Sequence, residues 1–366
     1  MNKFFGIVIV LANLLLPTTL TAIKVLHLSF HHGCVKDFEV VAQELHLDLT
    51  SWYILEKPGA EFDGYSKGNA VYNISHERAE KIWIKHKDYF NQFDAIVTSD
   101  TAPLARIFLQ NGWKNPLIIW ICNRFDYYDW ESRDSEFPDA EYYNLFNKAA
   151  TQSNVKVIGY VAYEHFYAST KGVNTGDIII KPCGSIENNM RYEGVSYIPH
   201  EIKKEETLFI PLRMEPHQVQ HLQSTCKKLG IATYCGQYNG PHDLKDFKGI
   251  LHFPYQWSNL ALFENMQLGL PHFVPSIKFL KELYRNDAER HLYRFFALDH
   301  LELSEWYCPE NSEVMIYFDS WEDLQYKVKT TDYQTLKEKI KAFGVLHKQE
   351  MLNRWRDTFA WAQAQL

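Results

Sequence analysis

Short apolar runs alternate with helical patterns along the first half of the chain. Runs rich in β-branched and apolar residues occupy 23–29, 47–55, 94–100, 116–126 and 155–161. Helical patterns occur at 37–45 and 162–172. Apolar runs separated by helices are typical of a parallel sheet that helices cover on both faces. We therefore predict one doubly wound α/β domain over residues 23–185.

A second, smaller alternation follows a polar segment. Residues 186–205 show no periodic pattern and are interpreted as a connector between domains. The second set of apolar runs lies at 207–212, 231–236, 249–254 and 272–276. These runs and the helical patterns between them predict a second α/β domain over 206–340. The tail at 341–366 is strongly helical and is expected to form a separate C-terminal helix.

The first 22 residues follow a different pattern. Lys3 precedes the apolar run FFGIVIVLANLLL, and small residues ending at Ala22 follow Pro17. This order is that of a secretory signal, and two alternatives stay open: cleavage after Ala22, or retention of residues 4–16 as a membrane anchor. Either way the body of the chain would enter the ER or Golgi lumen, a bacterial periplasm or the medium. In a eukaryotic host, Asn73 begins a glycosylation sequon.

Charge and motif content exclude several classes of protein. The formal net charge is −7, whereas a nucleic-acid-binding domain normally carries a basic excess. No GxGxxG or Walker-type loop is present, which argues against dehydrogenases and NTPases. The cysteines show no CxxC or Cys/His spacing, so no metal site is expected. In an oxidising lumen these six residues either pair or stay as buried free thiols: Cys34, Cys122, Cys183, Cys226, Cys235 and Cys308.

One carboxylate interrupts an apolar helical pattern at residues 255–271. Ser258 is a good N-cap, and Gly269 with Pro271 is a good helix stop. Between them, Glu264 has apolar and amide neighbours at helical spacing. A buried carboxylate needs a hydrogen-bond donor, so either a ligand or a structural partner must complete it.

The order of these features resembles a known family. A strand ending in Arg213, the segment GPHDL, the Glu-bearing helix and the following Gly-Leu-Pro look like the donor half of a GT-B glycosyltransferase. The likeness is strongest to the retaining family of glycogen synthase and the bacterial mannosyl- and glucosyltransferases. Pro182-Cys183-Gly184 resembles the turn that closes the first domain there. The resemblance implies two Rossmann-like domains, with C-terminal helices that cross back to the first.

The resemblance also implies roles in the second domain. The family motif has two glutamates separated by seven residues. The second falls on Glu264, which would accept hydrogen bonds from the ribose of a nucleotide-sugar, and Gln256 stands at the first, where its amide would orient the sugar. Arg213 would neutralise the diphosphate leaving group. Phosphate oxygens would meet the backbone N–H groups of the helix start, at Ser258, Asn259 and Leu260.

Polar residues at strand ends of the first domain face the same expected cleft. His31 or His32 would be a general base for the acceptor hydroxyl, or both are solvated loop residues. Gly33 would let the backbone approach a ligand. Contacts to the acceptor are expected from a group of residues at strand ends: Asp100, Asn123, Arg124 and Asp126.

The sequence thus predicts a lumenal, metal-independent, two-domain glycosyltransferase. Its substrates would be a nucleotide-sugar and a glycan or glycoconjugate acceptor, with retention preferred and inversion expected if a histidine is the base. Two alternatives are open. One is a periplasmic-type solute-binding protein, which also joins a signal peptide to two α/β lobes. The other is a catalytically silent, glycan-binding relative, since Gln256 cannot supply a negative charge.

Overall fold

The computed structural model describes most of the chain in seven segments: 22–54, 74–123, 125–126, 140–186, 198–211, 216–286 and 299–366. Residues 1–21 of the predicted signal, Asn73, Arg124 and Arg213 lie outside the described residues. Within these segments, no helix has the length and apolar character required to cross a membrane.

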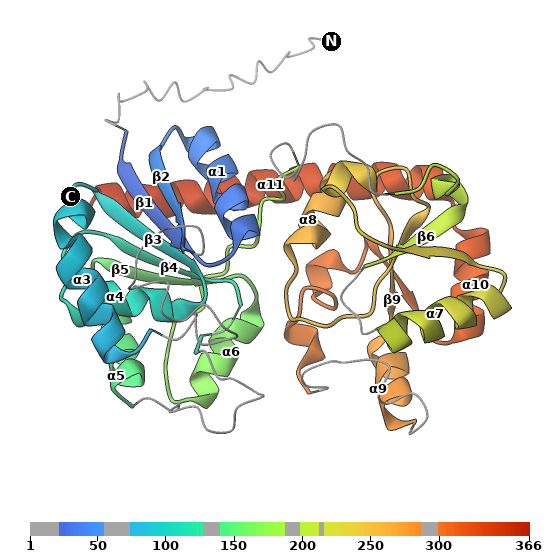
Figure 1. The fold of residues 1–366 in the computed structure, drawn as a ribbon, viewed down its shortest axis with the longest axis horizontal. Coiled ribbons are helices and arrows are strands. Elements are labelled where there is room, and N and C mark those ends of the chain that lie inside the picture. The colour runs from blue at the N-terminus through green and yellow to red at the C-terminus, as the bar shows by residue number, and fades with distance from the viewer. Residues whose placement is uncertain are drawn as a thin grey trace, which may run out of the picture.

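The first domain is built on a parallel sheet whose strands follow the order β2-β1-β3-β4-β5. Figure 1 shows this sheet with helices on either side. Its described elements are β1 (Lys24–Ser29), α1 (His32–Leu45), β2 (Asp48–Tyr53), α3 (His76–Phe90), β3 (Ala95–Asp100), α4 (Arg106–Gln110), β4 (Leu117–Ile121), α5 (Ala140–Ala149), β5 (Val155–Gly159) and α6 (Ala162–Thr170).

The second domain repeats the plan with a parallel sheet in the order β10-β9-β8-β6-β7. Residues 198–206, the described part of the segment that leads into this domain, include the 3₁₀ turn Lys204–Glu206. Its elements are β6 (Thr207–Ile210), α7 (Pro216–Lys228), β7 (Ala232–Cys235), β8 (Gly249–Leu251), α8 (Leu260–Gln267), β9 (His272–Pro275), α9 (Ile277–Arg285), β10 (Met315–Phe318) and α10 (Trp321–Thr330).

Alternating side chains of each first-domain strand enter two different cores. Ile118 and Trp120 of β4 pack on the face that α1 covers, whereas Leu117 and Ile119 pack on the face that α3, α4 and α5 cover. All four side chains are at most 1% exposed. Burial on both faces explains why the strands read as continuous apolar runs rather than as an alternation of apolar and polar residues.

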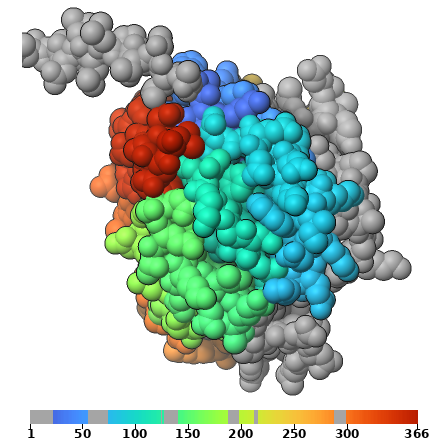
Figure 2. Space-filling model, turned by 90° about the vertical axis from the view of Figure 1, so that its left-hand side faces the viewer, coloured from blue at the N-terminus to red at the C-terminus, as the bar shows by residue number. Residues whose placement is uncertain are grey.

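The last helix, α11 (Tyr333–Gln363), joins the two domains. Its first half packs on the second domain, where Ile340 shares a core with Phe263 and Met266 of α8. Its second half lies on the first domain, where the Trp355 ring makes an edge contact with the Trp120 ring at 5.0 Å. Figure 2 shows the end of this helix against the first-domain surface. The expected boundary at residue 341 falls inside one continuous helix.

The predicted fold class is confirmed: two doubly wound parallel α/β domains with a terminal helix that crosses back to the first. Two local predictions were wrong. The first helix begins at His32 rather than near Asp37, so His32 and Gly33 form its first turn instead of a loop. Helix α8 begins at Leu260 with Asn259 as its N-cap, one residue later than the predicted N-cap Ser258.

Candidate active site

The carboxyl ends of the strands in both sheets open onto one cleft. This cleft has a volume of about 780 Å³ and is lined by both domains. Ligands of open α/β sheets bind at this edge, because the loops that follow the strands converge there. The structure brings ten of the predicted site residues into its lining: His31, His32, Gly33, Asp100, Asn123, Gln256, Ser258, Asn259, Leu260 and Glu264.

The start of α1 forms part of the first-domain wall. His31 is the N-cap residue, and its backbone N–H donates to Ser29 Oγ at 3.1 Å. Its side chain and that of His32 are both exposed to solvent, and the His32 ring meets the Tyr53 ring edge-on at 5.6 Å. Two imidazoles therefore stand at the cleft with access to a bound hydroxyl, as a general base requires.

Gly33 also has a packing role that the sequence analysis did not predict. A Cβ atom at this position would lie 2.6 Å from Leu260 Cδ1 of the second domain and 2.9 Å from His31 Cε1. The Leu260 side chain of the facing domain thus occupies the position that a Gly33 side chain would take. The missing side chain lets α1 and the start of α8 come close together.

Asp100 and Cys122 continue this wall at the ends of β3 and β4. Asp100 is 4% exposed and has a left-handed backbone, with φ of 75°. Its carbonyl accepts hydrogen bonds from the N–H groups of Cys122 and Asn123, each at 3.0 Å. A non-glycine residue in this region costs roughly 1–2 kcal/mol, and such strained residues cluster at functional sites.

Helix α8 carries the candidate carboxylate of the second-domain wall. Glu264 is 7% exposed and lines the cleft, and it also interacts with another group of the protein. The Gln256 side chain lines the same cleft, while its carbonyl accepts a 3.1 Å hydrogen bond from Trp306 Nε1. The two residues of the predicted motif therefore face one cavity.

The start of α8 departs from the predicted phosphate site. The Asn259 N–H donates to Glu305 Oε2 at 2.8 Å, so a buried carboxylate takes the amide expected to meet a phosphate. The Asn259 side chain caps the helix by accepting from the Ala261 N–H at 3.0 Å. Ser258 Oγ donates to the Cys122 carbonyl at 2.9 Å, which links the two domains across the cleft.

One predicted acceptor contact is wrong. Asp126 is 1% exposed and is not part of the cleft lining. Its two carboxylate oxygens accept hydrogen bonds from Tyr143 OH at 2.5 Å and Tyr167 OH at 2.8 Å. Asp126 therefore ties α5 to α6 and is a structural residue. Arg124 and Arg213 are outside the described residues, and their roles stay predictions.

The sequence analysis missed a polar cluster on the second-domain wall. His252 follows β8, stacks on the Trp306 ring at 3.8 Å, and lines the cleft with Asn265 and His272. Within the described part of the chain, His252 Nε2 and Asn265 Oδ1 are buried without a hydrogen-bond partner. Burial lowers the pKa of His252 well below its usual value, so its ring is neutral. His252 directly follows the apolar run that forms β8, and this position could have indicated that it lies in the cleft.

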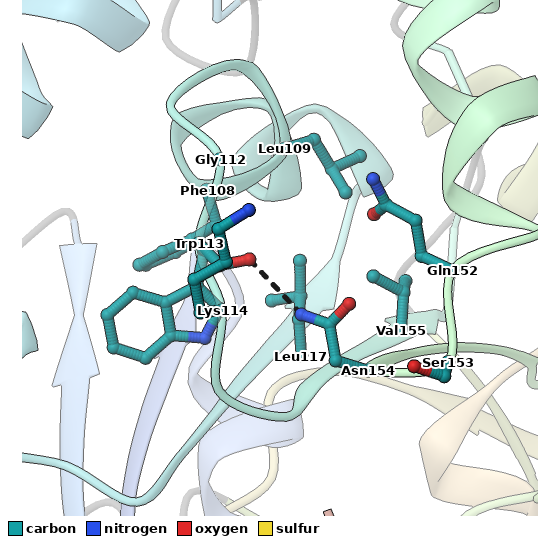
Figure 3. A pocket seen from close by; sticks show the side chains of 10 residues that line it. All are labelled: Phe108, Leu109, Gly112, Trp113, Lys114, Leu117, Gln152, Ser153, Asn154 and Val155. Carbon is teal, nitrogen blue, oxygen red and sulfur yellow. Dashed lines mark hydrogen bonds between the residues drawn. The ribbon is translucent and has the colours of Figure 1, made fainter.

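A second cavity, of about 280 Å³, lies near the amino ends of the first-sheet strands, away from the cleft. It is lined by the starts of β4 and β5 and by the turn that carries Trp113. Figure 3 shows the Asn154 amide pointing at the Trp113 carbonyl, to which it donates at 3.1 Å. The Asn154 amide donor is thus used within the protein, and Lys114 is the one charged residue among the described residues that line this cavity. This cavity carries no chemistry comparable to that of the cleft.

All six cysteines are free thiols; five of them are buried, as in the second alternative that the sequence left open, and Cys235 is half-buried. Among the residues that the structure describes, no three His, Cys, Asp or Glu side chains are grouped as metal ligands would be.

Known structures match this chain in fold, whereas no protein-family model and no curated protein matches its sequence. Sucrose-phosphate synthase from Thermosynechococcus elongatus is 11% identical, with 92% of this chain and 99% of that chain covered and a TM-score of 0.51. A UDP-forming trehalose-phosphate synthase from Burkholderia xenovorans is 8% identical, with 93% and 98% covered and a TM-score of 0.52.

A match to TarM covers 72% of this chain but only 54% of that one, at 13% identity and a TM-score of 0.42, so this chain spans about half of TarM. At such identities the likeness establishes the fold and no more. The chain has the GT-B architecture of two facing parallel α/β domains.

Proposed function

We propose that this protein is a glycosyltransferase that moves a sugar from a nucleotide-sugar to a hydroxyl acceptor. The observation that carries the proposal is the single cleft at the carboxyl ends of both sheets. There the exposed imidazoles of one domain face the Gln256 and Glu264 side chains of the other. Two structures of similar fold are named sucrose-phosphate synthase and UDP-forming trehalose-phosphate synthase, and these names describe enzymes that join a sugar to an acceptor.

The second domain would hold the donor. Glu264 is buried in the cleft wall and would accept hydrogen bonds from ribose hydroxyls, and Gln256 would orient the transferred sugar. The unpartnered atoms His252 Nε2 and Asn265 Oδ1 support a polar ligand on this wall, because a buried polar atom without a partner costs about 1–3 kcal/mol. Arg213, three residues after the end of β6 in the sequence, would balance the charge of the departing diphosphate.

The first domain would hold the acceptor. His31 or His32 would take the proton of the attacking hydroxyl, with Asp100 and Asn123 as further contacts. Closure of the cleft would align this hydroxyl with the anomeric carbon and exclude water. The resemblance of the Glu264 region favours retention of configuration, whereas a histidine base would favour inversion.

Three further parts of the proposal concern conditions and place. Transfer would need no metal, because a cationic side chain rather than an ion would neutralise the diphosphate. The chain would act in a secretory or periplasmic lumen. Residues 4–16 would attach it to the membrane wherever the signal is not cleaved.

Thermal unfolding with a panel of nucleoside diphosphates tests the donor site. A ligand at 100 times its dissociation constant should stabilise the protein by about 2.7 kcal/mol. Donor hydrolysis in the presence of excess EDTA then tests catalysis without metal. Loss of all activity, restored by manganese or magnesium, would contradict metal independence. Nucleotide binding without turnover would favour the silent relative, and binding of a small solute but no nucleotide would favour the solute-binding protein.

A further inference from the structure

One part of the cleft lies within the second domain, where α8 and the strands β6, β8 and β9 contribute to its lining. We call this part the recess, and six residues define it: Phe209, Leu244, Ile250, His252, Asn265 and His272. Each of the six is at most 3% exposed. The recess therefore combines apolar walls with three buried polar side chains.

His272 fixes the orientation of the Asn265 amide. Asn265 Nδ2 lies 3.4 Å from His272 Nε2, and an amide NH₂ group can only donate, so this imidazole nitrogen accepts. Burial lowers the pKa of His272 to about 4, which keeps its ring neutral and able to accept. With its nitrogen engaged there, the amide presents its oxygen elsewhere. Within the described residues, Asn265 Oδ1 is buried and has no hydrogen-bond partner.

The His252 ring is held in place in a comparable way. Its backbone N–H donates to the Phe273 carbonyl at 2.9 Å, which fixes the residue beside β9. Its ring stacks on the Trp306 ring at 3.8 Å, and Trp306 Nε1 is anchored to the Gln256 carbonyl at 3.1 Å. His252 Nε2 is the second buried atom of the recess without a partner among the described residues.

These features select the chemistry of a ligand. A phosphate does not fit, because burying its charge would require a cation, and the recess offers neutral side chains. A sugar ring would bring hydroxyl groups on most of its carbons to walls that are largely apolar. A nucleobase has apolar faces and a polar edge that carries N–H groups. It suits an apolar pocket with a few fixed polar atoms, of which Asn265 Oδ1 requires a donor.

We propose that the recess binds the nucleobase of the donor, with Asn265 Oδ1 accepting a hydrogen bond from a base N–H group and His252 Nε2 pairing with the neighbouring atom of the same edge. This inference rests on the proposed function and specifies where the donor is recognised. Glu264 directly precedes Asn265 on α8 and lines the same cleft, so consecutive residues would bind the ribose and the base. Asn265 and His252 would then determine which nucleotide the protein accepts.

Calorimetric titration of the full chain with UDP, GDP, ADP, CDP and inorganic pyrophosphate tests the proposal. Pyrophosphate has no base and measures the contribution of the diphosphate alone. One nucleoside diphosphate should bind at least about tenfold more tightly than the weakest of the four, because a site built around hydrogen bonds rejects a base that leaves them unmade. An analogue of the preferred nucleotide whose base N–H groups are methylated should bind the parent protein about tenfold more weakly or worse.

Two variants assign this selectivity to the recess. His252→Phe keeps a flat ring on Trp306, and Asn265→Leu keeps a side chain of similar size. Each should lower the affinity for the preferred nucleotide about tenfold, while the affinity for pyrophosphate stays within about twofold of the parent value. Asn265→Leu should also bind the methylated and unmethylated nucleotides equally. The matched controls, His217→Phe and Asn353→Leu at exposed sites on α7 and α11, should behave as the parent does.

The outcomes separate this inference from the proposed function. If the parent protein binds the methylated analogue with full affinity, or if the two variants keep the selectivity of the parent, the inference is overturned and the transferase proposal stands. The analogue is compared on the parent protein, so this decision does not require a variant that folds. If neither pyrophosphate nor any nucleotide binds, both proposals are overturned.

Discussion

The two domains meet along two sides that differ in construction. On the helix side, formed by α8, α11 and the turn Pro182–Cys183–Gly184, backbone packs directly on backbone. A Cβ atom on Gly184 would lie 2.7 Å from the Phe263 carbonyl oxygen, and one on Gly344 would lie 2.8 Å from that of Met266. On the cleft side the contacts are made by side chains, such as the stack of Tyr163 on Trp257 at 3.5 Å.

Hydrogen bonding follows the same division. The turn of the helix side is held by the Asp37 carboxylate, which accepts from the N–H groups of Cys183 at 3.0 Å and Gly184 at 2.8 Å. Gln267 Nε2 adds a 2.7 Å bond to the Gly344 carbonyl. On the cleft side, the Ser258 hydroxyl donates a hydrogen bond to the Cys122 carbonyl of the other domain. This bond depends on one freely rotating hydroxyl group. The helix side is therefore held by backbone contacts, and we expect any opening around a ligand to occur on the cleft side, where side chains make the contacts.

The largest effect is expected from Gly184→Ala, which tests the backbone contacts of the helix side. Gly184 has φ of 81°, and so does Gly176, where a Cβ atom would meet nothing within 4 Å. Gly176→Ala should cost only the backbone strain of about 1–2 kcal/mol. Gly184→Ala should cost about 1–3 kcal/mol more, because the new methyl group meets backbone that cannot rotate away. Urea denaturation of both variants measures the difference, and equal losses would refute tight backbone packing on this side.

The cleft side should show the reverse pattern, with function lost and folding kept. If an imidazole is the general base, His31→Ala or His32→Ala should lower kcat by roughly 10²-fold or more. Donor affinity should stay near that of the parent. His217, exposed on α7, provides the control substitution. Parental turnover in both single variants and in the double variant would leave the two histidines as solvated surface residues.

Glu264 belongs to α8, which packs on the helix side, but it lines the cleft. Its substitution therefore tests whether it stabilises the fold or binds a ligand. As a ribose ligand it would make hydrogen bonds of about 1.5–3 kcal/mol each, so Glu264→Gln should weaken nucleotide-sugar binding by roughly tenfold or more. The melting temperature of the empty protein should change little. Glu282→Gln, on the exposed face of α9, is the control. A large fall in melting temperature with affinity retained would instead assign Glu264 to the helix side.

Buried titratable groups give the stability a predicted pH dependence. Burial raises the pKa of Asp37 to about 7 and that of Glu305 to about 8, so the folded state binds their protons where the unfolded state does not. Burial lowers the pKa of five imidazoles, which the unfolded state protonates more readily than the folded state near pH 6: His27, His165, His252, His272 and His347.

The five imidazoles outnumber the two carboxyls, so the free energy of unfolding should rise with pH up to about pH 6.5 and fall from there to about pH 8. Glu305→Gln should flatten the fall on the alkaline side, since it removes the carboxyl with the higher pKa. Glu302→Gln, at an exposed site three residues away, should leave the profile unchanged. Melting temperatures measured from pH 5 to 8.5 decide this, and an alkaline limb that Glu305→Gln does not alter would contradict it.

The fold was predictable because its strands are buried on both faces and read as apolar runs. β10 was missed, since it is a four-residue edge strand with two half-buried positions and pairs only with β9. The principle that ligands bind at the carboxyl ends of parallel strands correctly placed His31, Asp100 and Asn123 in one cleft. It failed at Asp126, whose partners Tyr143 and Tyr167 come from helices later in the chain.

Long-range contacts also decide how α8 begins. The Asn259 N–H donates to Glu305, which is 46 positions further along the chain. No local pattern at residues 255–271 contains that partner, and Ser258 satisfies local capping preferences equally well. The position of a helix start within one residue, and the use of its N–H groups, therefore required the tertiary structure.

The smallest effect is expected from Gly33→Ala, which tests the cleft side directly. The new methyl group would overlap Leu260 Cδ1, the end of a side chain that can rotate away, so the free energy of unfolding should fall by less than about 1 kcal/mol. Leu260→Ala in the same chain removes the overlapping atom and should restore the interdomain distance, which small-angle scattering or a fluorophore pair across the cleft would report. A loss as large as that of Gly184→Ala, unrelieved by Leu260→Ala, would mean that both sides of the junction are rigid and that the cleft does not open by side-chain release.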